Sequence, residues 1–147
     1  IVLLLLYLIQ LPIAIMKHVD FNSSSLLVDN VMSKAIISVN INTPAFQIAN
    51  MMELGGIGAI LVKENGIHVG IITDRDFATK IAAKNLPFDT PVKKIMSSPL
   101  ITINHKEPIF AAAKMMSHKK VRKLAVTENG KIVGLITSTD LVNQIAK

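Results

Sequence analysis

The sequence contains no cysteine and no tryptophan, and only 4% of its 147 residues are aromatic. Without cysteine, disulfide bridges, zinc–thiolate sites and a cysteine nucleophile are excluded. A chain without cysteine fits a reducing compartment, and we expect a cytoplasmic protein. With a single tyrosine, the chain also has few side chains on which nucleic-acid bases stack.

Recognisable catalytic motifs are missing as well. The sequence has no P-loop, no G-x-S-x-G turn and no G-x-G-x-x-G after a strand. The glycines of Gly55-Gly56-Ile57-Gly58 follow a predicted helix, and they indicate a helix C-cap and turn. The four histidines lack metal-ligand spacing: His18, His68, His105 and His118. We therefore expect no enzymatic activity and no metal site.

Residues 1–15 form a long apolar run without a charged residue. The run is shorter than the about 20 residues of a spanning helix, and it contains Gln10 and Pro12. We predict an extension that is not native or is disordered, followed by a leader segment at 16–27. The alternatives are a segment that packs on the protein or a partner, and a membrane anchor. We do not expect a membrane partner.

Positive charge is concentrated in the second half of the chain. The net charge is +6, and from Pro91 onward ten Lys and Arg residues stand against three Asp and Glu residues. The densest group, the basic patch, consists of Lys119, Lys120, Arg122 and Lys123. Such a patch binds phosphate, either in a small anion or in a nucleic-acid backbone. A solvated helix end is the alternative, because cations stabilise helix C-termini.

An internal repeat organises the chain. A shift of 64 positions aligns residues 28–83 with 92–147 without a gap, and about 21 of about 56 pairs are identical. The identities include Glu64-Asn65-Gly66 with Glu128-Asn129-Gly130. We predict a first repeat at 28–84, a linker at 85–91 and a second repeat at 92–147.

Each repeat predicts the order β-α-β-β-α. In the first repeat these elements are Ile36–Val39, a helix that begins at Pro44, Ile60–Val62, Val69–Thr73 and Asp76–Ala83. Helical spacing places Phe46, Ala49 and Met52, and their counterparts in the second repeat, in the core. One repeat has about 55 residues and a marginal core. We therefore expect an α/β fold in which two sheets pack together around a pseudo-two-fold axis.

The repeated pattern resembles a tandem pair of CBS domains, the Bateman module. The matching motifs are Val31-Met32-Ser33 with Ile95-Met96-Ser97, and Gly70-Ile71-Ile72-Thr73-Asp74-Arg75-Asp76 with Gly134-Leu135-Ile136-Thr137-Ser138-Thr139-Asp140. The resemblance implies a stand-alone regulatory module that binds AMP, ADP, ATP or an S-adenosyl compound and uses no catalytic cofactor. It also implies a homodimer and a separate, unidentified regulated protein.

The resemblance assigns roles to the residues of this motif. Asp76 and Asp140 bind ribose hydroxyls, since one carboxylate accepts hydrogen bonds from both. Thr73 and Thr137 bind phosphate where a strand turns into a helix. Helix capping is the alternative, and the two roles are compatible. Ile37 and Ile101 cover the adenine, or are ordinary core residues.

Basic residues distinguish the two predicted sites. Family members place cations that enter the second strand of one repeat beside a phosphate whose ribose is bound by the other repeat. Arg122 and Lys123, with Lys120, then complete the Asp76 site, whereas Asp140 faces Gly58 and Ala59. Arg75 assists a site or lies on the surface. We therefore predict a strong site at Asp76 and a weak one at Asp140. The alternative functions are nucleic-acid binding by the basic patch and a pure protein-interaction module.

Overall fold

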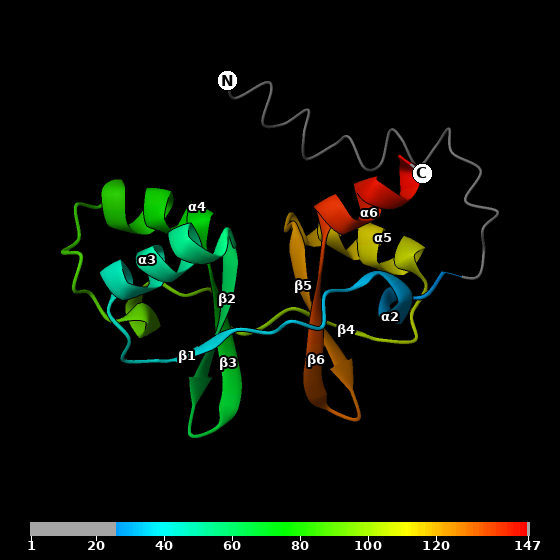
Figure 1. Cartoon of the computed structure of the whole chain (residues 1–147), viewed down its shortest axis with the longest axis horizontal. Coiled ribbons are helices and arrows are strands. Elements are labelled where there is room, and N and C mark those ends of the chain that lie inside the picture. The colour runs from blue at the N-terminus through cyan, green and yellow to red at the C-terminus, as the bar shows by residue number, and fades with distance from the viewer. Residues whose placement is uncertain (1–25, 147) are drawn as a thin grey trace. The chain divides into compact units, whose positions relative to one another are not determined.

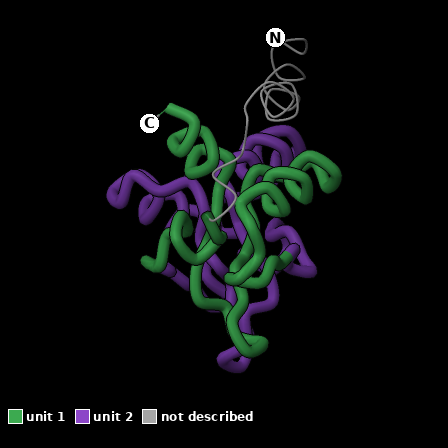
Figure 2. The backbone as a smooth tube through the Cα atoms, turned by 90° about the vertical axis from the view of Figure 1, so that its right-hand side faces the viewer, with its two compact units in different colours: residues 1–35, 102–147 green, residues 36–101 purple. Residues whose placement is uncertain are grey.

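The computed structural model describes residues 26–146 in two compact units (Figure 2). Unit 1 combines 26–35 with 102–146, and unit 2 consists of residues 36–101. The predicted extension at 1–15 and the leader residues 16–25 lie outside the described residues. Among the helices of the described part, none combines the length and the apolar character needed to cross a membrane.

Unit 2 contains a three-stranded sheet and two longer helical segments (Figure 1). Its elements are β1 (Ser38–Asn40), α3 (Ala45–Gly55), β2 (Ala59–Glu64), β3 (Ile67–Thr73), α4 (Asp74–Asp76), the π-helical turn η1 (Phe77–Ala82) and the 3-10 turn η2 (Val92–Lys94). The strand order is β1-β2-β3. Strand β2 pairs in parallel with β1 and antiparallel with β3, which leaves the middle strand paired on both sides.

Unit 1 repeats this topology. Its elements are α2 (Val28–Val31), β4 (Thr102–Asn104), α5 (Ile109–Lys119), β5 (Lys123–Glu128), β6 (Lys131–Thr137) and α6 (Ser138–Ile145). The strand order is β4-β5-β6, with β5 parallel to β4 and antiparallel to β6. The predicted α/β class and the β-α-β-β-α order are therefore confirmed in both units.

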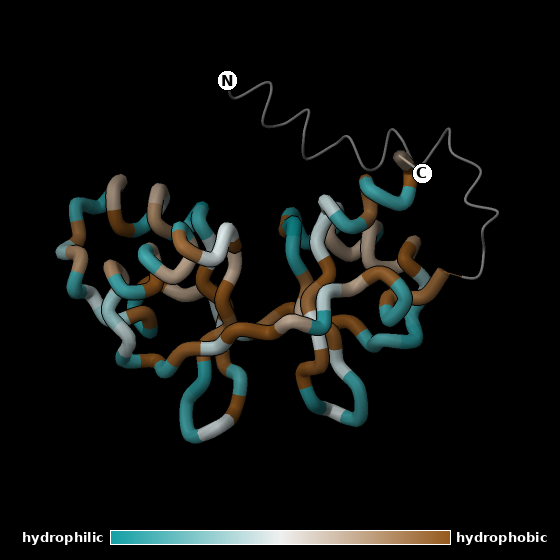
Figure 3. The backbone as a smooth tube through the Cα atoms, in the orientation of Figure 1, coloured by the Kyte–Doolittle hydropathy of each residue, from teal (hydrophilic) through white to brown (hydrophobic). Residues whose placement is uncertain are grey.

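The hairpins form where the Asn-Gly pairs predict them. Asn65 and Gly66 have φ angles of 50° and 77°, and Asn129 and Gly130 have 49° and 76°. Two consecutive positive φ angles match the twist of the flanking strands, which is why Asn-Gly favours a two-residue hairpin. Figure 3 shows hydrophilic residues at these tips and hydrophobic residues along the strands.

The core of each unit lies between the middle strand and its helices. Ile60, Leu61 and Val62 of β2 are fully buried. On α3 the buried residues are Ala45, Ile48 and Met52. The predicted core position of Phe46 is wrong, because Phe46 is 51% exposed. The buried stripe begins one residue earlier, since the spacing from Ala45 to Ile48 and Met52 follows the helical repeat more closely.

The second helix shows the same shift. Its buried residues are Ile109, Ala112, Ala113 and Met116. Phe110, the counterpart of Phe46, is 48% exposed, so its predicted core position is also wrong. Met52 and Met116 are therefore part of the core, whereas Phe46 and Phe110 are not.

The compact units do not have the same boundaries as the sequence repeats, because the first segment of each repeat belongs to the unit formed by the other repeat. Residues 28–35 belong to unit 1, with the strands of the second repeat, and residues 92–101 belong to unit 2, with those of the first. Ser33 exchanges two backbone hydrogen bonds with Leu135, at 2.8 and 3.0 Å, and Ser97 does the same with Ile71. Each unit is therefore completed by the segment that begins the other repeat.

Candidate functional site

The turn from the last strand into the last helix carries a Thr-x-x-Asp motif in each unit. Strand β3 ends at Thr73, and Asp76 follows as the third residue of the helix. The Asp76 Oδ2 atom accepts from the Thr73 backbone N–H at 2.8 Å and from the Thr73 hydroxyl at 3.2 Å. In unit 1, Asp140 Oδ2 accepts from the Thr137 N–H at 2.8 Å. Both aspartates therefore cap their own helices, and the capping interpretation is confirmed.

The second oxygen of Asp76 is bound by side chains of unit 2. Asp76 is 6% exposed. Its Oδ1 atom lies 2.9 Å from the Lys80 Nζ atom and accepts from the Ser97 hydroxyl at 3.3 Å. Lys80 stands one turn further along the helix, and Ser97 belongs to the segment that enters from the second repeat. Both carboxylate oxygens of Asp76 therefore have protein partners.

The Lys80 ammonium also binds the backbone of the incoming segment. It donates to the Ile95 carbonyl at 2.8 Å, and the Met96 carbonyl and the Ser97 hydroxyl lie at 3.4 Å. An ammonium has three N–H donors. Together with Asp76, these oxygens satisfy all three, so Lys80 joins the helix firmly to residues 95–97.

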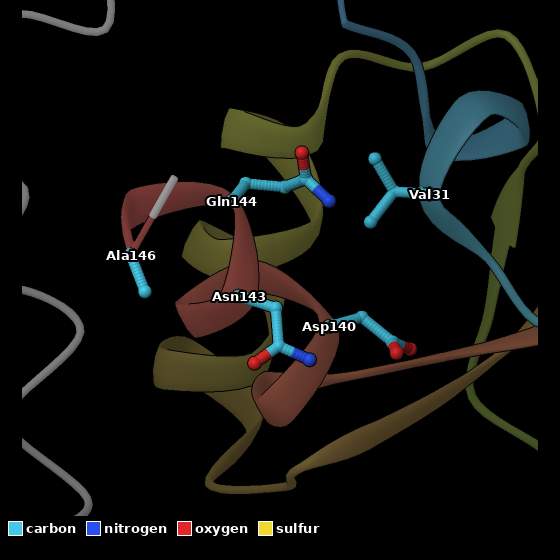
Figure 4. Close-up of a pocket in the computed structure, with 5 residues that line it drawn as sticks. All are labelled: Val31, Asp140, Asn143, Gln144 and Ala146. Carbon is cyan, nitrogen blue, oxygen red and sulfur yellow. The ribbon is translucent and has the colours of Figure 1, made fainter.

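Asp140 has a different environment in unit 1. An open pocket of about 490 Å³ is lined by Val31, Asp140, Asn143, Gln144 and Ala146. In Figure 4 the side chains of Gln144 and Val31 extend toward each other, and the Asp140 carboxylate points to the same side. Among the described residues no cation forms an ion pair with Asp140. In the described part of the chain, the Asp140 carboxylate therefore faces the pocket without a cation bound to it.

Two of the predicted basic residues, Arg122 and Lys123, lie next to the turn after Thr137 in unit 1. The Arg122 carbonyl accepts from the Ser138 N–H at 2.9 Å, and Lys123 is paired with Thr137 across β5 and β6. Lys120 is the exposed, left-handed C-cap of α5, with a φ angle of 56°. The three cations therefore share a unit with Asp140. Their pairing with Asp76 joins residues of different units and stays a prediction.

The remaining predicted residues belong to unit 2. The Gly58 carbonyl accepts from the Asp74 N–H at 3.2 Å, and Ala59 is paired with Thr73. Arg75 is exposed. Ile37 is 39% exposed, and Ile101 is half-buried. Ile37 and Ile101 are thus partly accessible, and their adenine-binding role stays a prediction.

Several residues of these sites were absent from the sequence prediction of the binding residues. They are Lys80 and Ser97 at Asp76, and Val31, Asn143, Gln144 and Ala146 in the pocket of unit 1. The shift of 64 positions pairs Lys80 with Gln144. Lys80 stands four residues after Asp76, a spacing at which a helix brings two side chains together. This signal was present in the sequence. The role of Ser97 was not, because it depends on the segment exchange between the units.

Histidines and carboxylates do not gather into a metal site in the described part of the chain, where no group of three could hold an ion. His105 lies 3.5 Å from Glu128 and 4.0 Å from Asp29. His68 is half-buried, and its Nε2 atom lies 3.0 Å from the Ser38 hydroxyl. Burial lowers the pKa of His68, and the Lys63 charge lowers it further.

Comparison with known proteins identifies the family. The model of the CBS domain matches residues 28–83 and 92–147. A CBS domain-containing protein of Bacillus subtilis, YhcV, is 31% identical over 120 residues, which are 81% of this chain and 86% of that protein. The chain belongs to the CBS-domain family, as the repeated motifs predicted. It spans 62% of a longer relative from Methanopyrus kandleri.

Solved structures support the same fold. A conserved protein of Pyrococcus horikoshii has a TM-score of 0.80 and 27% identity, over 84% of this chain and 95% of that one. The CBS domain pair of protein MJ0100 has a TM-score of 0.74 and 28% identity, over 82% and 96% of the two chains. That structure is described as a complex with 5′-methylthioadenosine and S-adenosyl-L-methionine.

Proposed function

We propose that this protein is a non-catalytic regulatory module that binds an adenosine-containing compound and transmits its occupancy to a separate protein. The observation that carries the proposal is the Asp140 carboxylate at the open pocket of unit 1. The complex of the MJ0100 domain pair with two adenosine compounds supports this ligand class. The ligands to be distinguished are AMP, ADP, ATP, S-adenosylmethionine and 5′-methylthioadenosine.

The chemistry of the pocket suits a ribose. Asp140 Oδ2 is held by the Thr137 N–H at 2.8 Å, which fixes the orientation of the carboxylate. Its other oxygen is free of cations among the described residues. A ribose presents two adjacent hydroxyl donors, and a carboxylate accepts from both with charge-assisted hydrogen bonds. The Gln144 amide and the Val31 side chain line the same space.

Regulation requires that the ligand favours one arrangement of the protein over another. Asp140 is the third residue of the last helix of unit 1, and Val31 belongs to the segment at 28–35 that completes the unit. A ligand in contact with both stabilises the conformation in which the helix and this segment are closed on each other. We propose that a regulated protein, or the other chain of a homodimer, senses this change.

Titration of the full-length protein tests the proposal. Isothermal calorimetry with the five compounds is expected to show binding of at least one of them. Asp140→Asn should weaken that binding by about 1.5–3 kcal/mol, the scale of a charged hydrogen bond. Asp89→Asn is the matched control, because Asp89 is an exposed carboxylate far along the chain from the motif. The 2′-deoxy analogue of the bound compound should also bind more weakly.

Binding measurements with nucleic acid and with a partner protein separate the alternatives. Nucleic-acid binding by the basic patch would fall steeply between 50 and 200 mM salt, in proportion to the number of phosphates contacted. Binding of a partner that ignores all five compounds would indicate a pure interaction module. If none of the compounds binds to the wild-type protein, the proposed function is wrong.

A further inference from the structure

The pocket of unit 1 has a counterpart in unit 2 that is filled by a side chain of the protein itself. The shift of 64 positions pairs the pocket residues with residues around the Lys80 ammonium. The pairs are Val31 with Ile95, Asp140 with Asp76, Asn143 with Thr79, Gln144 with Lys80 and Ala146 with Ala82. In unit 1 the Asp140 carboxylate therefore lines an open pocket, whereas in unit 2 the Lys80 ammonium occupies the corresponding place.

In unit 2 the Lys80 ammonium saturates the site. It lies 2.9 Å from Asp76 Oδ1 and 2.8 Å from the Ile95 carbonyl, with the Ser97 hydroxyl at 3.4 Å. The Lys80 side chain is 30% exposed and the Asp76 side chain 8%. A ligand hydroxyl that bound Asp76 would have to displace this ammonium. The displaced cation would lose charge-assisted hydrogen bonds in a partly desolvated position, which strongly disfavours the exchange.

In the described part of unit 1, no cationic side chain occupies Asp140 as Lys80 occupies Asp76. Gln144 is neutral, so it cannot form the ion pair that Lys80 forms. Within the described part of the chain, Asp140 has no paired cation, and it lines an open pocket. Arg122 and Lys123 also lie in this unit, beside the Thr137 end of the same motif. As far as its residues are described, unit 1 therefore contains both the aspartate without a paired cation and the basic residues Arg122 and Lys123.

We propose that Lys80 is an internal occupant that closes the Asp76 site, so that the chain binds one adenosine compound, at Asp140. This inference rests on the proposed function and adds the residue that decides which copy is open. It reverses the ranking predicted from the sequence, which gave the stronger site to Asp76. Both copies have the aspartate. The two sites differ in ligand binding because Lys80 in one copy corresponds to Gln144 in the other.

Exchange of this pair is the decisive experiment. Calorimetry on the full-length protein, with the compounds above, is expected to give one ligand per chain. Gln144→Lys should weaken binding at least about tenfold, because the new ammonium competes for Asp140. Lys80→Gln should raise the stoichiometry toward two. Asp76→Asn should leave the affinity within about twofold, whereas Asp140→Asn should weaken it at least about tenfold. Circular dichroism verifies that each variant is folded.

The outcomes separate this inference from the proposed function. Two equal sites in the wild-type protein would overturn the role of Lys80 while supporting the proposed function. Loss of binding in Asp76→Asn but not in Asp140→Asn would do the same. An absence of binding to the wild type and to every variant would instead contradict the proposed function.

A measurement without ligand tests the internal ion pair directly. Lys80 should react with an amine-acetylating reagent several-fold more slowly than Lys84, which is exposed, when the products are quantified by mass spectrometry. Asp76→Asn should raise the rate at Lys80 and leave the rate at Lys84 unchanged. Equal rates at the two lysines of the wild-type protein would overturn the closure of the Asp76 site.

Discussion

At the scale of single residues, Gly70 and Gly134 show how closely the exchanged segments pack on the strands. A Cβ atom on Gly134 would lie 2.6 Å from the Met32 sulfur and 2.7 Å from the Ser33 carbonyl oxygen. At Gly70 the corresponding distances, to Met96 and Ser97, are 2.6 and 3.0 Å. The methionine side chain can move, but the Ser33 carbonyl is held by a hydrogen bond from the Leu135 N–H. Glycine is therefore required by this close approach.

Gly134→Ala is expected to destabilise the protein by about 1–3 kcal/mol, the usual cost of overpacking. Urea unfolding followed by circular dichroism measures the change. Gly55→Ala is the matched control, since its added Cβ would meet only the Ile57 side chain, at 3.4 Å. A helical glycine replaced by alanine gains up to about 1 kcal/mol. Equal stabilities of Gly134→Ala and the wild type would contradict the close packing of residues 32–33.

At the level of secondary-structure elements, the N-terminal turn of each last helix orients its aspartate carboxylate. The side chains of the rest of that helix determine whether a cation pairs with this carboxylate. The helix after Asp76 continues as the π-helical turn η1, whereas α6 after Asp140 is a regular α-helix. Lys80 belongs to η1 and binds residues 95–97. The same motif is therefore joined to residues 95–97 in one unit, whereas in the other its aspartate lines an open pocket.

The β2–β3 hairpin gives a prediction about the pH dependence of stability. His68 is opposite Lys63 in the register of the two strands, and burial and this charge lower its pKa below 6.5. The folded protein then binds fewer protons than the unfolded chain, whose histidine titrates normally. Stability is therefore lost as the pH falls through 6.5 toward the lowered value.

His68→Gln should reduce this loss. The free energy of unfolding, from urea titrations at pH 7.5 and pH 5.0, should fall less in the variant than in the wild type. His118→Gln is the control, because His118 is exposed at the end of α5. If both variants keep the pH dependence of the wild type, the assignment to His68 is wrong.

At the scale of the whole molecule, the two units depend on each other through their exchanged segments. Val28 and Val92 are both fully buried. The Val28 N–H donates to the Glu107 carbonyl in unit 1, and the Val92 N–H donates to the Thr43 carbonyl in unit 2, each at 2.8 Å. Each valine thus belongs by sequence to one repeat and by packing to the core of the other.

Val28→Ala should therefore weaken the strands of the second repeat. We expect a loss of about 1–3 kcal/mol, from the methyl groups removed and the cavity left. Hydrogen exchange should rise in β5 and β6 and not in β2 and β3. Val92→Ala, the matched variant, should show the reverse pattern. If Val28→Ala instead increases exchange in β2 and β3, the segment assignment is refuted.

The duplication, the β-α-β-β-α order, the Asn-Gly hairpins and the family could be predicted from the sequence, because they depend on local spacing and on residue identities repeated at a fixed shift. The capping role of Thr73 and Asp76 was predictable for the same reason, because the four residues from the N-cap to the third helical residue define it. The core stripe of α3 was displaced by one residue, since a helix can turn slightly about its axis to bury Ala45 and Ile48 instead of Phe46.

The difference between the two motifs arises from tertiary contacts and could not be predicted from the sequence. The partners of Asp76 include Ser97, which is 21 residues away in the chain. The segment at 95–97 belongs to the unit that contains the strands of the first repeat, where its carbonyl and hydroxyl oxygens bind the Lys80 ammonium. Lys80, held in this way, pairs with the Asp76 carboxylate. Charge counted along the sequence favoured the Asp76 site. The fold places an internal cation on Asp76 and leaves the Asp140 carboxylate facing an open pocket, because the side chain one helical turn later is lysine in one repeat and glutamine in the other.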